Sequence, residues 1–245
     1  MIIRRKEHFG DRKLKKAVIP PGTEAVEDWA YGACVNLREV WFPTGIRLSA
    51  KAFEGSENIE KVCIYTIEEE LNAGRNVNSL TETAALVLLV WPEEMTGLLT
   101  DFSDEKLSAL IRDKLPIYLE EADDNGFRPF LAGGEEDYGD EASEREDYIF
   151  RNRLRKVRLS LDAMFLGAGD HSLYIRECGA DVILSVLKNI KTRREDYVSL
   201  CFEKELFDCG ELNELPERAA EDAELKALLI KHSGVKADTL DKLEI

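Results

Sequence analysis

The chain has 245 residues, of which 44% are hydrophobic and 33% are charged, a balance typical of a soluble globular protein with one large domain or two ordinary ones. Its formal net charge of -16 argues against sequence-independent binding to DNA or to anionic lipid, because both require a positive surface. The longest apolar run, Ala84 to Trp91, is far shorter than the roughly 18 to 20 residues that cross a bilayer, and no apolar segment follows the basic N-terminus as it would in a secretion signal. We therefore expect a cytoplasmic protein.

Residues 14–65 contain an internal repeat. The sequence Leu-Lys-Lys-Ala-Val-Ile-Pro, which begins at Leu14, recurs as Leu-Arg-Glu-Val-Trp-Phe-Pro from Leu37 and as Ile-Glu-Lys-Val-Cys-Ile-Tyr from Ile59. The copies start 23 and then 22 residues apart, a period that indicates a solenoid. Each copy has the pattern of a short strand, and Pro43 ends the second one because proline lacks a ladder donor. We expect Leu14, Leu37 and Ile59 to be equivalent interior residues of parallel neighbouring strands.

The second half of each unit is repeated as well. The aromatic Tyr31 corresponds to Phe53 in the next unit, and Asn36 likewise corresponds to Asn58. We expect the aromatic side chains to fill the interior and the asparagine side chains to hydrogen-bond the backbone of the turns. Residues 1–13 are expected to form a short edge strand or a cap, because a terminal turn has no neighbour on its outer side.

The sequence Ala-Tyr-Gly-Ala-Cys-Val-Asn-Leu at residues 30–37 resembles the BspA-like class of bacterial leucine-rich repeats, whose units contain Ala-Phe-x-x-Cys-x-x-Leu. Ser56 replaces the cysteine in the following unit. The resemblance covers residues 14–65 and implies a short parallel leucine-rich-repeat sheet with Cys34 as a packed thiol of the core. The whole arrangement is similar to uncharacterised bacterial proteins in which such repeats precede a helical tail, and this resemblance implies no known catalytic residues.

One face of the predicted sheet is a candidate binding site. If Val40 and Phe42 point inward, the alternation of side chains along a strand turns Trp41 outward. The repeat register then places an apolar residue on each side of Trp41 and a row of charged residues parallel to this stripe. The candidate protein-contact face therefore comprises Lys16, Val18, Glu39, Trp41, Lys61 and Cys63. Either the helical region folds back and buries this face, or the face stays open and binds a partner, since large aromatic residues dominate the binding energy of many interfaces.

Helical patterns dominate after residue 79. We therefore expect an α+β protein, with a repeat domain at 1–78 and an α-helical domain at 79–245. The expected helices span 80–91, 103–119, 144–165, 172–177, 180–190, 193–207, 212–220 and 224–232. The stretch Leu86–Pro92 has an alternative interpretation as a further repeat strand, because it runs into proline as the second repeat strand does. The later helices weakly resemble ankyrin-type helix pairs, and the glycine-rich, acidic run near 133–147 is expected to be a mobile loop.

Two charged segments have competing interpretations. Glu121–Gly126 carries oxygen side chains at the spacing that opens an EF-hand calcium loop, but Ala132 stands where the bidentate glutamate is required, so a capped helix end is the simpler interpretation. The acidic run 135–147 either contacts the basic stretch 151–158 or a basic partner, or is a solvated loop beside a solvated helix face. The basic stretch lacks the interleaved aromatic residues of a nucleic-acid site.

The sequence contains no motif that specifies catalysis or metal binding. The five cysteines include no Cys-x-x-Cys pair, the three histidines lie at no zinc spacing, and no phosphate loop, nucleophile elbow or His-Glu-x-x-His sequence occurs. We therefore expect a non-catalytic module that binds an unknown protein partner, without cofactor, metal, nucleic acid or membrane. The alternatives are a cell-surface adhesin of the leucine-rich-repeat type and an enzyme with a dispersed site that includes His171 or His232.

Overall fold

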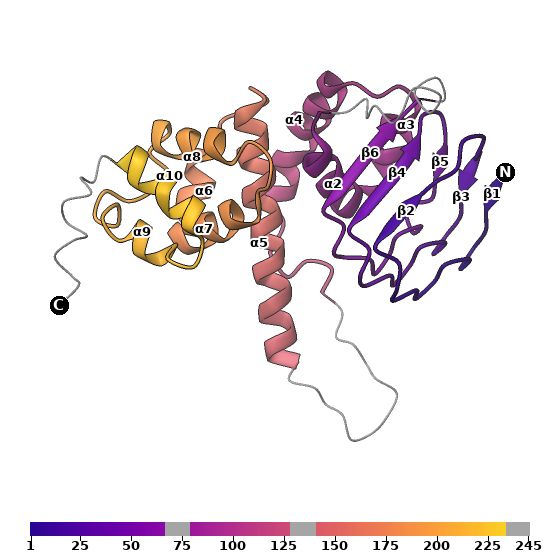
Figure 1. Ribbon diagram of the computed structural model, residues 1–245, viewed down its shortest axis with the longest axis horizontal. Helices are drawn as coiled ribbons and strands as arrows, with labels where there is room; N and C mark the ends of the chain where they lie inside the picture. The colour runs from indigo at the N-terminus through magenta and orange to yellow at the C-terminus, as the bar shows by residue number, and fades with distance from the viewer. Residues whose placement is uncertain (67–78, 128–140, 234–245) are drawn as a thin grey trace. The chain divides into compact units, whose positions relative to one another are not determined.

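A computed structural model describes residues 1–66, 79–127 and 141–233 (Figure 1). Its contacts divide the chain into two units, Met1–Leu110 and Ile111–Ile245. The first unit contains two three-stranded parallel sheets, and the second is helical, so the predicted α+β fold class is confirmed. The predicted boundary between residues 78 and 79 falls inside the first unit, because the helix after residue 80 packs on the last strand of the repeats.

The strands of the first unit alternate between two parallel sheets, as in a solenoid (Figure 1). One sheet has the order β1-β3-β5 and consists of β1 (Ile2–Ile3), β3 (Ala25–Val26) and β5 (Arg47–Leu48). The other has the order β2-β4-β6 and consists of β2 (Lys16–Val18), β4 (Glu39–Pro43) and β6 (Lys61–Tyr65). Lys16 is opposite Glu39, which is opposite Lys61, so the register predicted from the repeat is confirmed.

The interior of the solenoid is filled by the side chains that alternate with the outward ones. Leu37 and Ile59 are buried in equivalent positions, as predicted, but they lie two residues before β4 and β6 and not within the strands. Leu14 occupies the same position in the first turn but is only half-buried, because that turn has a neighbour on one side alone. The expected set of three equivalent residues therefore exists, but its first member belongs to the end of the stack.

Each turn of the solenoid repeats the same backbone conformation and side-chain bonds. Gly10, Ala33 and Gly55 have φ angles of 71°, 53° and 80°, a left-handed conformation that favours glycine at two of the three positions. Asn36 Nδ2 donates to the carbonyl of Arg12 at 2.6 Å, and Asn58 Nδ2 donates to that of Val35 at 2.8 Å. The predicted role of the two asparagines is confirmed. Residues 1–13 are more than an edge strand, because they form a complete half-turn of the repeat.

An aromatic stack runs through the interior of the turns. The ring centroids of His8 and Tyr31 are 4.7 Å apart, and those of Tyr31 and Phe53 are 5.2 Å apart. Beside this stack Cys34 is fully buried, which agrees with its predicted role in the core. Its backbone N–H donates to Ser56 Oγ at 2.9 Å, and the Ser56 hydroxyl donates to the carbonyl of Tyr31 at 2.6 Å. The serine in the place of cysteine thus supplies a hydroxyl that links two turns.

Two helices close the end of the solenoid at β5 and β6. They are α2 (Thr81–Val90), which packs on β6, and α3 (Met95–Thr100), which packs on β5; the 3-10 helix η1 (Pro92–Glu94) connects them. The helical interpretation of Leu86–Pro92 is therefore correct. The N-cap of α2 is Leu80, which makes no side-chain capping bond, and the hydroxyl of the preceding Ser79 donates to Asp104 Oδ2 at 2.6 Å.

Side chains and backbone of α3 satisfy the free edge of β5. Thr96 Oγ1 accepts a hydrogen bond from the Leu48 N–H at 2.9 Å and donates one to the Leu48 carbonyl at 3.0 Å. The Gly45 N–H donates to the carbonyl of Leu99 at 2.7 Å. An edge strand would otherwise expose these groups, so α3 takes the place of a further strand.

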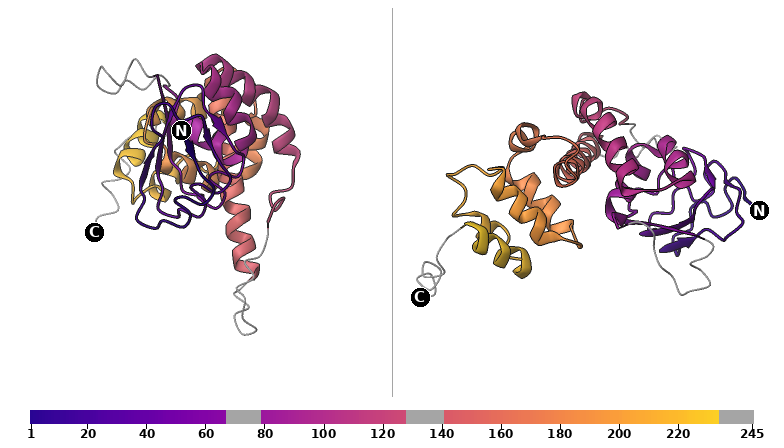
Figure 2. Two further views of the ribbon diagram at one scale, coloured as in Figure 1. Left: turned by 90° about the vertical axis from the view of Figure 1, so that its right-hand side faces the viewer. Right: turned by 90° about the horizontal axis from the view of Figure 1, so that it is seen from above.

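The second unit is built from helices that surround one apolar core (Figure 2). The helix α4 (Asp104–Glu120) begins in the first unit and ends in the second. The helices that contribute to the core are α5 (Glu141–Phe165), α6 (Ser172–Cys178), α7 (Ala180–Asn189), α8 (Arg194–Glu203), α9 (Leu215–Arg218) and α10 (Ala223–Ser233). In α7, which packs against α5, the buried residues Val182, Ile183, Val186 and Leu187 recur at helical spacing. No helix that the structure describes has the length and apolar character needed to span a membrane.

Most predicted helices are present, with three differences. The helix expected at 193–207 ends at Glu203, and the one expected at 212–220 is a single turn. Residues 141–147 of the expected acidic loop form the first turns of α5, where the side chains of 142–147 are exposed. The rest of the predicted loop, 133–140, lies outside the described residues.

Candidate protein-contact face

The predicted contact face lies on the outer side of sheet β2-β4-β6. The inner row across the three strands, Ala17, Val40 and Val62, is buried, so the residues that alternate with it point outward. The strand pairing produces the two predicted rows of the contact face, Lys16-Glu39-Lys61 and Val18-Trp41-Cys63.

Trp41 is half-buried and is held by polar neighbours on the same face. Lys16 Nζ lies 4.4 Å from the centroid of the indole ring and 3.1 Å from Glu39 Oε1. The indole N–H in turn donates to Glu39 Oε1. Burial raises the pKa of Glu39, but the hydrogen bonds from Trp41 and Lys16 outweigh this effect and hold the pKa below its usual value. The ionised Glu39 therefore fixes both the ring and the cation that lies over it.

The apolar stripe is less open than the repeat pattern suggests. Val18 at one end is 51% exposed, whereas Cys63 at the other end is only 3% exposed. Burial, reinforced by the negative charge of Glu39, raises the pKa of the Cys63 thiol to about 11. Cys63 is thus a packed thiol and presents no surface to a partner. Of the two alternatives for this face, the covered one applies at Cys63, since the register determines the side of the sheet but not the cover over each residue.

Tyr65 supports Trp41 from the outer side of the sheet although the sequence did not single it out; at 4% exposed it is itself covered, as Cys63 is. Its ring centroid lies 6.3 Å from that of Trp41 at an angle of 45°, and its hydroxyl donates to the carbonyl of Ile19 at 2.5 Å. The Tyr65 side chain therefore reaches from β6 to the residue that follows β2. The signal was present in the alternation along β6, which puts Tyr65 on the same side as Cys63.

A second tryptophan has a similar setting at a turn of the solenoid. Trp29 is half-buried, Arg5 Cζ lies 4.5 Å from its ring centroid, and Lys6 Nζ and Lys51 Nζ lie 5.6 Å and 5.7 Å from it. The indole N–H donates to Glu54 Oε2 at 2.5 Å. Lys6, Trp29 and Lys51 occupy one repeat position in three successive turns, so the alignment of the repeats would have revealed this contact.

The outer side of the other sheet carries an open groove of about 460 Å³, lined by residues of β1, β3 and β5 and the turns beside them. Its carboxylates are engaged with neighbours. Glu27 accepts a hydrogen bond from the backbone N–H of Arg5 at 2.9 Å, and Asp28 accepts one from the Ser49 hydroxyl.

In the second unit the residues of the possible calcium loop are bonded to cations instead. Asp123 pairs with Arg153 at 2.6 Å and with the buried Lys156 at 2.9 Å, and Asp124 pairs with Arg145. Lys156 also donates to the carbonyl of Glu121. The loop is therefore a helix end tied to α5, which agrees with the simpler interpretation. Among the described residues, no group of three or more potential ligand side chains is placed to hold a metal ion.

Among the described residues, the basic stretch 151–158 pairs with the side-chain carboxylates of Asp123 and Asp162, and Arg151 Nε donates to the carbonyl of Asp147 at 3.3 Å. In addition to the pairs with Asp123, Arg158 Nε donates to the buried Asp162 at 2.9 Å, and the Tyr197 hydroxyl donates to the same carboxylate at 2.6 Å. One interpretation of the acidic run 135–147 is a contact with this stretch. Residues 135–140 of that run lie outside the described part of the chain. The pairs that are described make the stretch a structural support of the helical core.

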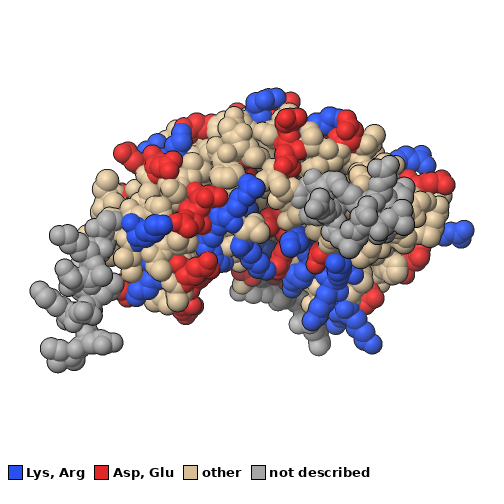
Figure 3. Space-filling view, turned by 45° about the horizontal axis from the view of Figure 1, so that its top comes forward, with Lys and Arg blue, Asp and Glu red and all other residues tan. Residues whose placement is uncertain are grey.

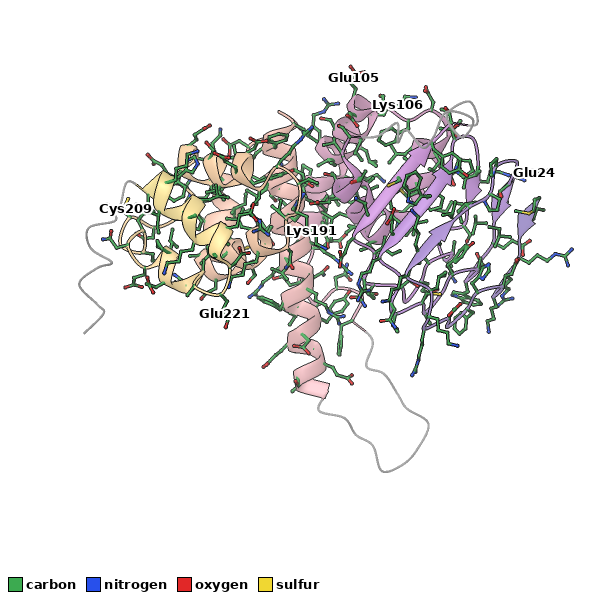
Figure 4. All side chains as sticks on the ribbon, viewed as in Figure 1. Glu24, Glu105, Lys106, Lys191, Cys209 and Glu221 are labelled. Atoms are coloured by element: carbon green, nitrogen blue, oxygen red, sulfur yellow. The ribbon has the colours of Figure 1, made fainter. Side chains whose placement is uncertain are left out.

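The two histidines named for a dispersed active site have separate surroundings. His171 precedes α6 and is half-buried, and burial lowers its pKa although the neighbouring Asp170 opposes this shift. His232 near the end of α10 stacks on Phe202, with ring centroids 5.9 Å apart. Cys209 is exposed on the turn before α9 (Figure 4). The described contacts do not join these residues into a catalytic set.

Comparisons of the chain with protein-family models, with curated proteins and with solved structures found no match. The resemblance to BspA-like repeats therefore rests on the residues of the repeat alone.

Proposed function

We propose that this protein is a non-catalytic protein-interaction module that binds its partner through the contact face on sheet β2-β4-β6. The observation that carries the proposal is the setting of Trp41, a half-buried indole held by Lys16, Glu39 and Tyr65 next to the exposed Val18. Tryptophan is enriched among the residues that dominate interface energies. A ring that is already fixed loses little conformational freedom when a partner covers it.

The surroundings of the face support this function. A parallel sheet in a solenoid presents a regular array of outward side chains, and the likeness to BspA-like leucine-rich repeats suggests a scaffold for protein recognition. We also propose a cytoplasmic location. All five cysteines are free thiols, and three of them are buried, whereas proteins of oxidising compartments commonly contain disulfides.

The variant Trp41→Ala tests the proposal, with Phe150→Ala as a matched control. Phe150 is an exposed aromatic residue on α5 in the other unit. The immobilised wild-type protein and both variants are used for capture from a native lysate, and a protein that is lost with Trp41→Ala alone is then purified. Its dissociation constant should increase by about tenfold or more with Trp41→Ala, as for a hot-spot residue, and should be unchanged with Phe150→Ala.

Stability must be measured on the same samples. Because Trp41 is half-buried, its replacement by alanine should cost about 1 to 2 kcal/mol, roughly half of the cost for a core aromatic residue. The variant should therefore remain folded at the temperature of the binding assay. If every purified partner binds Trp41→Ala as tightly as wild type, the contact face is not the binding site and the proposal is wrong.

A further inference from the structure

The two ends of the solenoid differ in how their edge strands are covered. At one end α2 and α3 close the sheets, as described above. At the other end β1 and β2 are the outer strands of their sheets, and neither is hydrogen-bonded to a further strand among the described residues. The left view of Figure 2 looks onto this end. An uncovered strand edge is a template for an additional strand.

The backbone of β2 shows which groups are available. The Lys15 carbonyl accepts from the Glu39 N–H at 3.2 Å, and the Ile19 N–H donates to the Trp41 carbonyl at 2.9 Å. In a parallel pair, residues whose groups face the neighbouring strand alternate with residues whose groups face away. The N–H and carbonyl groups of Lys16 and Val18 therefore point to the free side of β2.

The same end exposes apolar side chains. Ile2, Phe9 and Val18 are 44%, 48% and 51% exposed, and each belongs to the first turn of the solenoid. In the second turn the position of Ile2 is held by Ala25 and that of Val18 by Trp41, each covered more than its counterpart in the first turn. The exposed residues thus mark the surface that the next turn would cover.

The charge of this end is opposite to that of the chain as a whole. Residues 1–16 contain seven Lys and Arg against Glu7 and Asp11, while the full chain has a net charge of -16. Among the described residues, Lys16 is the one member of the seven with a side-chain carboxylate partner, Glu39. Acidic and basic side chains are otherwise interspersed over much of the face seen in Figure 3. A second copy of the chain would bring two basic ends together, so the charge favours an acidic partner.

We propose that the free side of β2 binds an extended acidic segment of the partner protein, which adds a fourth strand to sheet β2-β4-β6. This inference rests on the proposed function and specifies the chemistry of the partner. Backbone groups of Lys16 and Val18 pair with the segment, its carboxylates meet Lys13 and Lys15, and its outward apolar side chain lies beside Val18. Strand addition would also extend the contact face by one row.

The test uses the full chain and a labelled peptide of about ten residues that alternates glutamate and valine, a length within the usual range of strands. Its binding is measured by fluorescence anisotropy at physiological ionic strength. A peptide that alternates lysine and valine tests the charge, and one with proline in place of each second valine tests the backbone pairing. Both should bind about tenfold more weakly or worse, since each removes one of the two required interactions.

Two variants of the protein, in place of changes in the peptide, separate the charge interaction from the backbone pairing. Val18→Pro removes an N–H that points to the free side, while the ladder to β4 uses Ala17 and Ile19, so the fold should be kept. The double variant Lys13→Glu with Lys15→Glu reverses charge without touching the backbone. Each should weaken binding of the glutamate-valine peptide by about tenfold or more, whereas Arg112→Glu on α4 should have no effect. Circular dichroism and thermal unfolding verify the fold of every variant.

Several results would overturn the inference. Binding that responds to Lys13→Glu with Lys15→Glu, but neither to Val18→Pro nor to the proline peptide, would show a mere electrostatic contact. Equal or tighter binding of a uridine oligonucleotide, insensitive to Val18→Pro, would assign the end to nucleic acid. A wild-type dimer that Val18→Pro dissociates would assign it to a second copy. If partner capture depends on Trp41 while no edge variant changes peptide binding, the proposed function stands and this inference fails. If instead the edge variants weaken peptide binding while partner capture does not depend on Trp41, the edge of β2 is a binding site and the contact face is not.

Discussion

Replacing Thr96 by valine tests whether one hydroxyl group closes the end of the repeat unit. Thr96 Oγ1 bonds both the N–H and the carbonyl of Leu48, which is 7% exposed on the last strand of its sheet. Valine has nearly the same shape but can make neither bond. Each lost hydrogen bond contributes about 0.5 to 1.5 kcal/mol, so we expect the free energy of unfolding of the first unit to fall by about 1 to 3 kcal/mol.

The assay can report on the first unit alone. The chain has three tryptophans, Trp29, Trp41 and Trp91, and all of them lie in residues 1–110. Urea unfolding followed by tryptophan fluorescence therefore measures this unit even if the helical unit unfolds separately. For a unit of this size 1 kcal/mol corresponds to roughly 4 to 8 °C, so the midpoint of thermal unfolding should fall by about 10 °C.

Two further variants separate the hydroxyl from other effects. Thr96→Ser keeps the hydroxyl and should lose much less stability than Thr96→Val. Thr100→Val removes an exposed hydroxyl that donates to the Thr96 carbonyl within the same helix, and we expect a change of less than about 0.5 kcal/mol. Equal stabilities of Thr96→Val and Thr96→Ser would show that the hydroxyl does not support the edge of the sheet, and the account of the closed end would be wrong.

Three other predictions concern the two units. A chain of residues 1–78 lacks the helices that cover the open edges, so its tryptophan fluorescence should show no cooperative thermal transition; a sharp transition would contradict this. Burial raises the pKa of Asp123, but hydrogen bonds from Arg153 and Lys156 outweigh this effect and hold the pKa below the usual 3.8. The contribution of the Asp123 carboxylate to the free energy of unfolding is therefore complete above about pH 3.8 and is lost as the pH falls through the folded-state pKa. The midpoint of thermal unfolding of Asp123→Asn should accordingly differ from wild type at pH 7 and approach it near pH 2, and a constant difference would refute the assignment. Ellman's reagent should react rapidly with one thiol, that of the exposed Cys209, and Cys209→Ser should abolish this phase, because Cys34, Cys63 and Cys201 are buried and Cys178 is half-buried with a pKa that burial raises; a remaining fast phase would show that one of these four thiols is accessible.

The register of sheet β2-β4-β6 could be predicted from the sequence because a repeat transmits one residue's position to the next turn. Once Leu37 and Ile59 are aligned, the pleat determines that Trp41 points outward. The first turn was harder to recognise, because His8 stands where the later turns have Tyr31 and Phe53. A stacked imidazole and a phenol ring are alike in shape and unlike in sequence.

The burial of residues on the outer side of the sheet and the capping of the last strands by helices could not be predicted, because both depend on contacts between segments distant in the chain. The alternation along β6 puts Cys63 on the outer side, yet the residue is buried. The role of Thr96 has no local signature, since a threonine in the first turn of a helix looks the same whether or not it bonds a strand 48 residues away. The interpretation of 1–78 as the whole repeat domain was too short for this reason.

The junctions between successive turns of the solenoid have the same structure. Asn36 and Asn58 each bond the turn before, and the aromatic rings and left-handed residues recur at the same points. A complete turn of 22 or 23 residues inserted between the second and third would meet a matching junction on both sides and leave the bonds of Thr96 intact. The outer face of sheet β2-β4-β6 can therefore grow by whole strands, each about 4.8 Å wide. An insertion of one residue within a strand would instead turn its outward side chains into the interior.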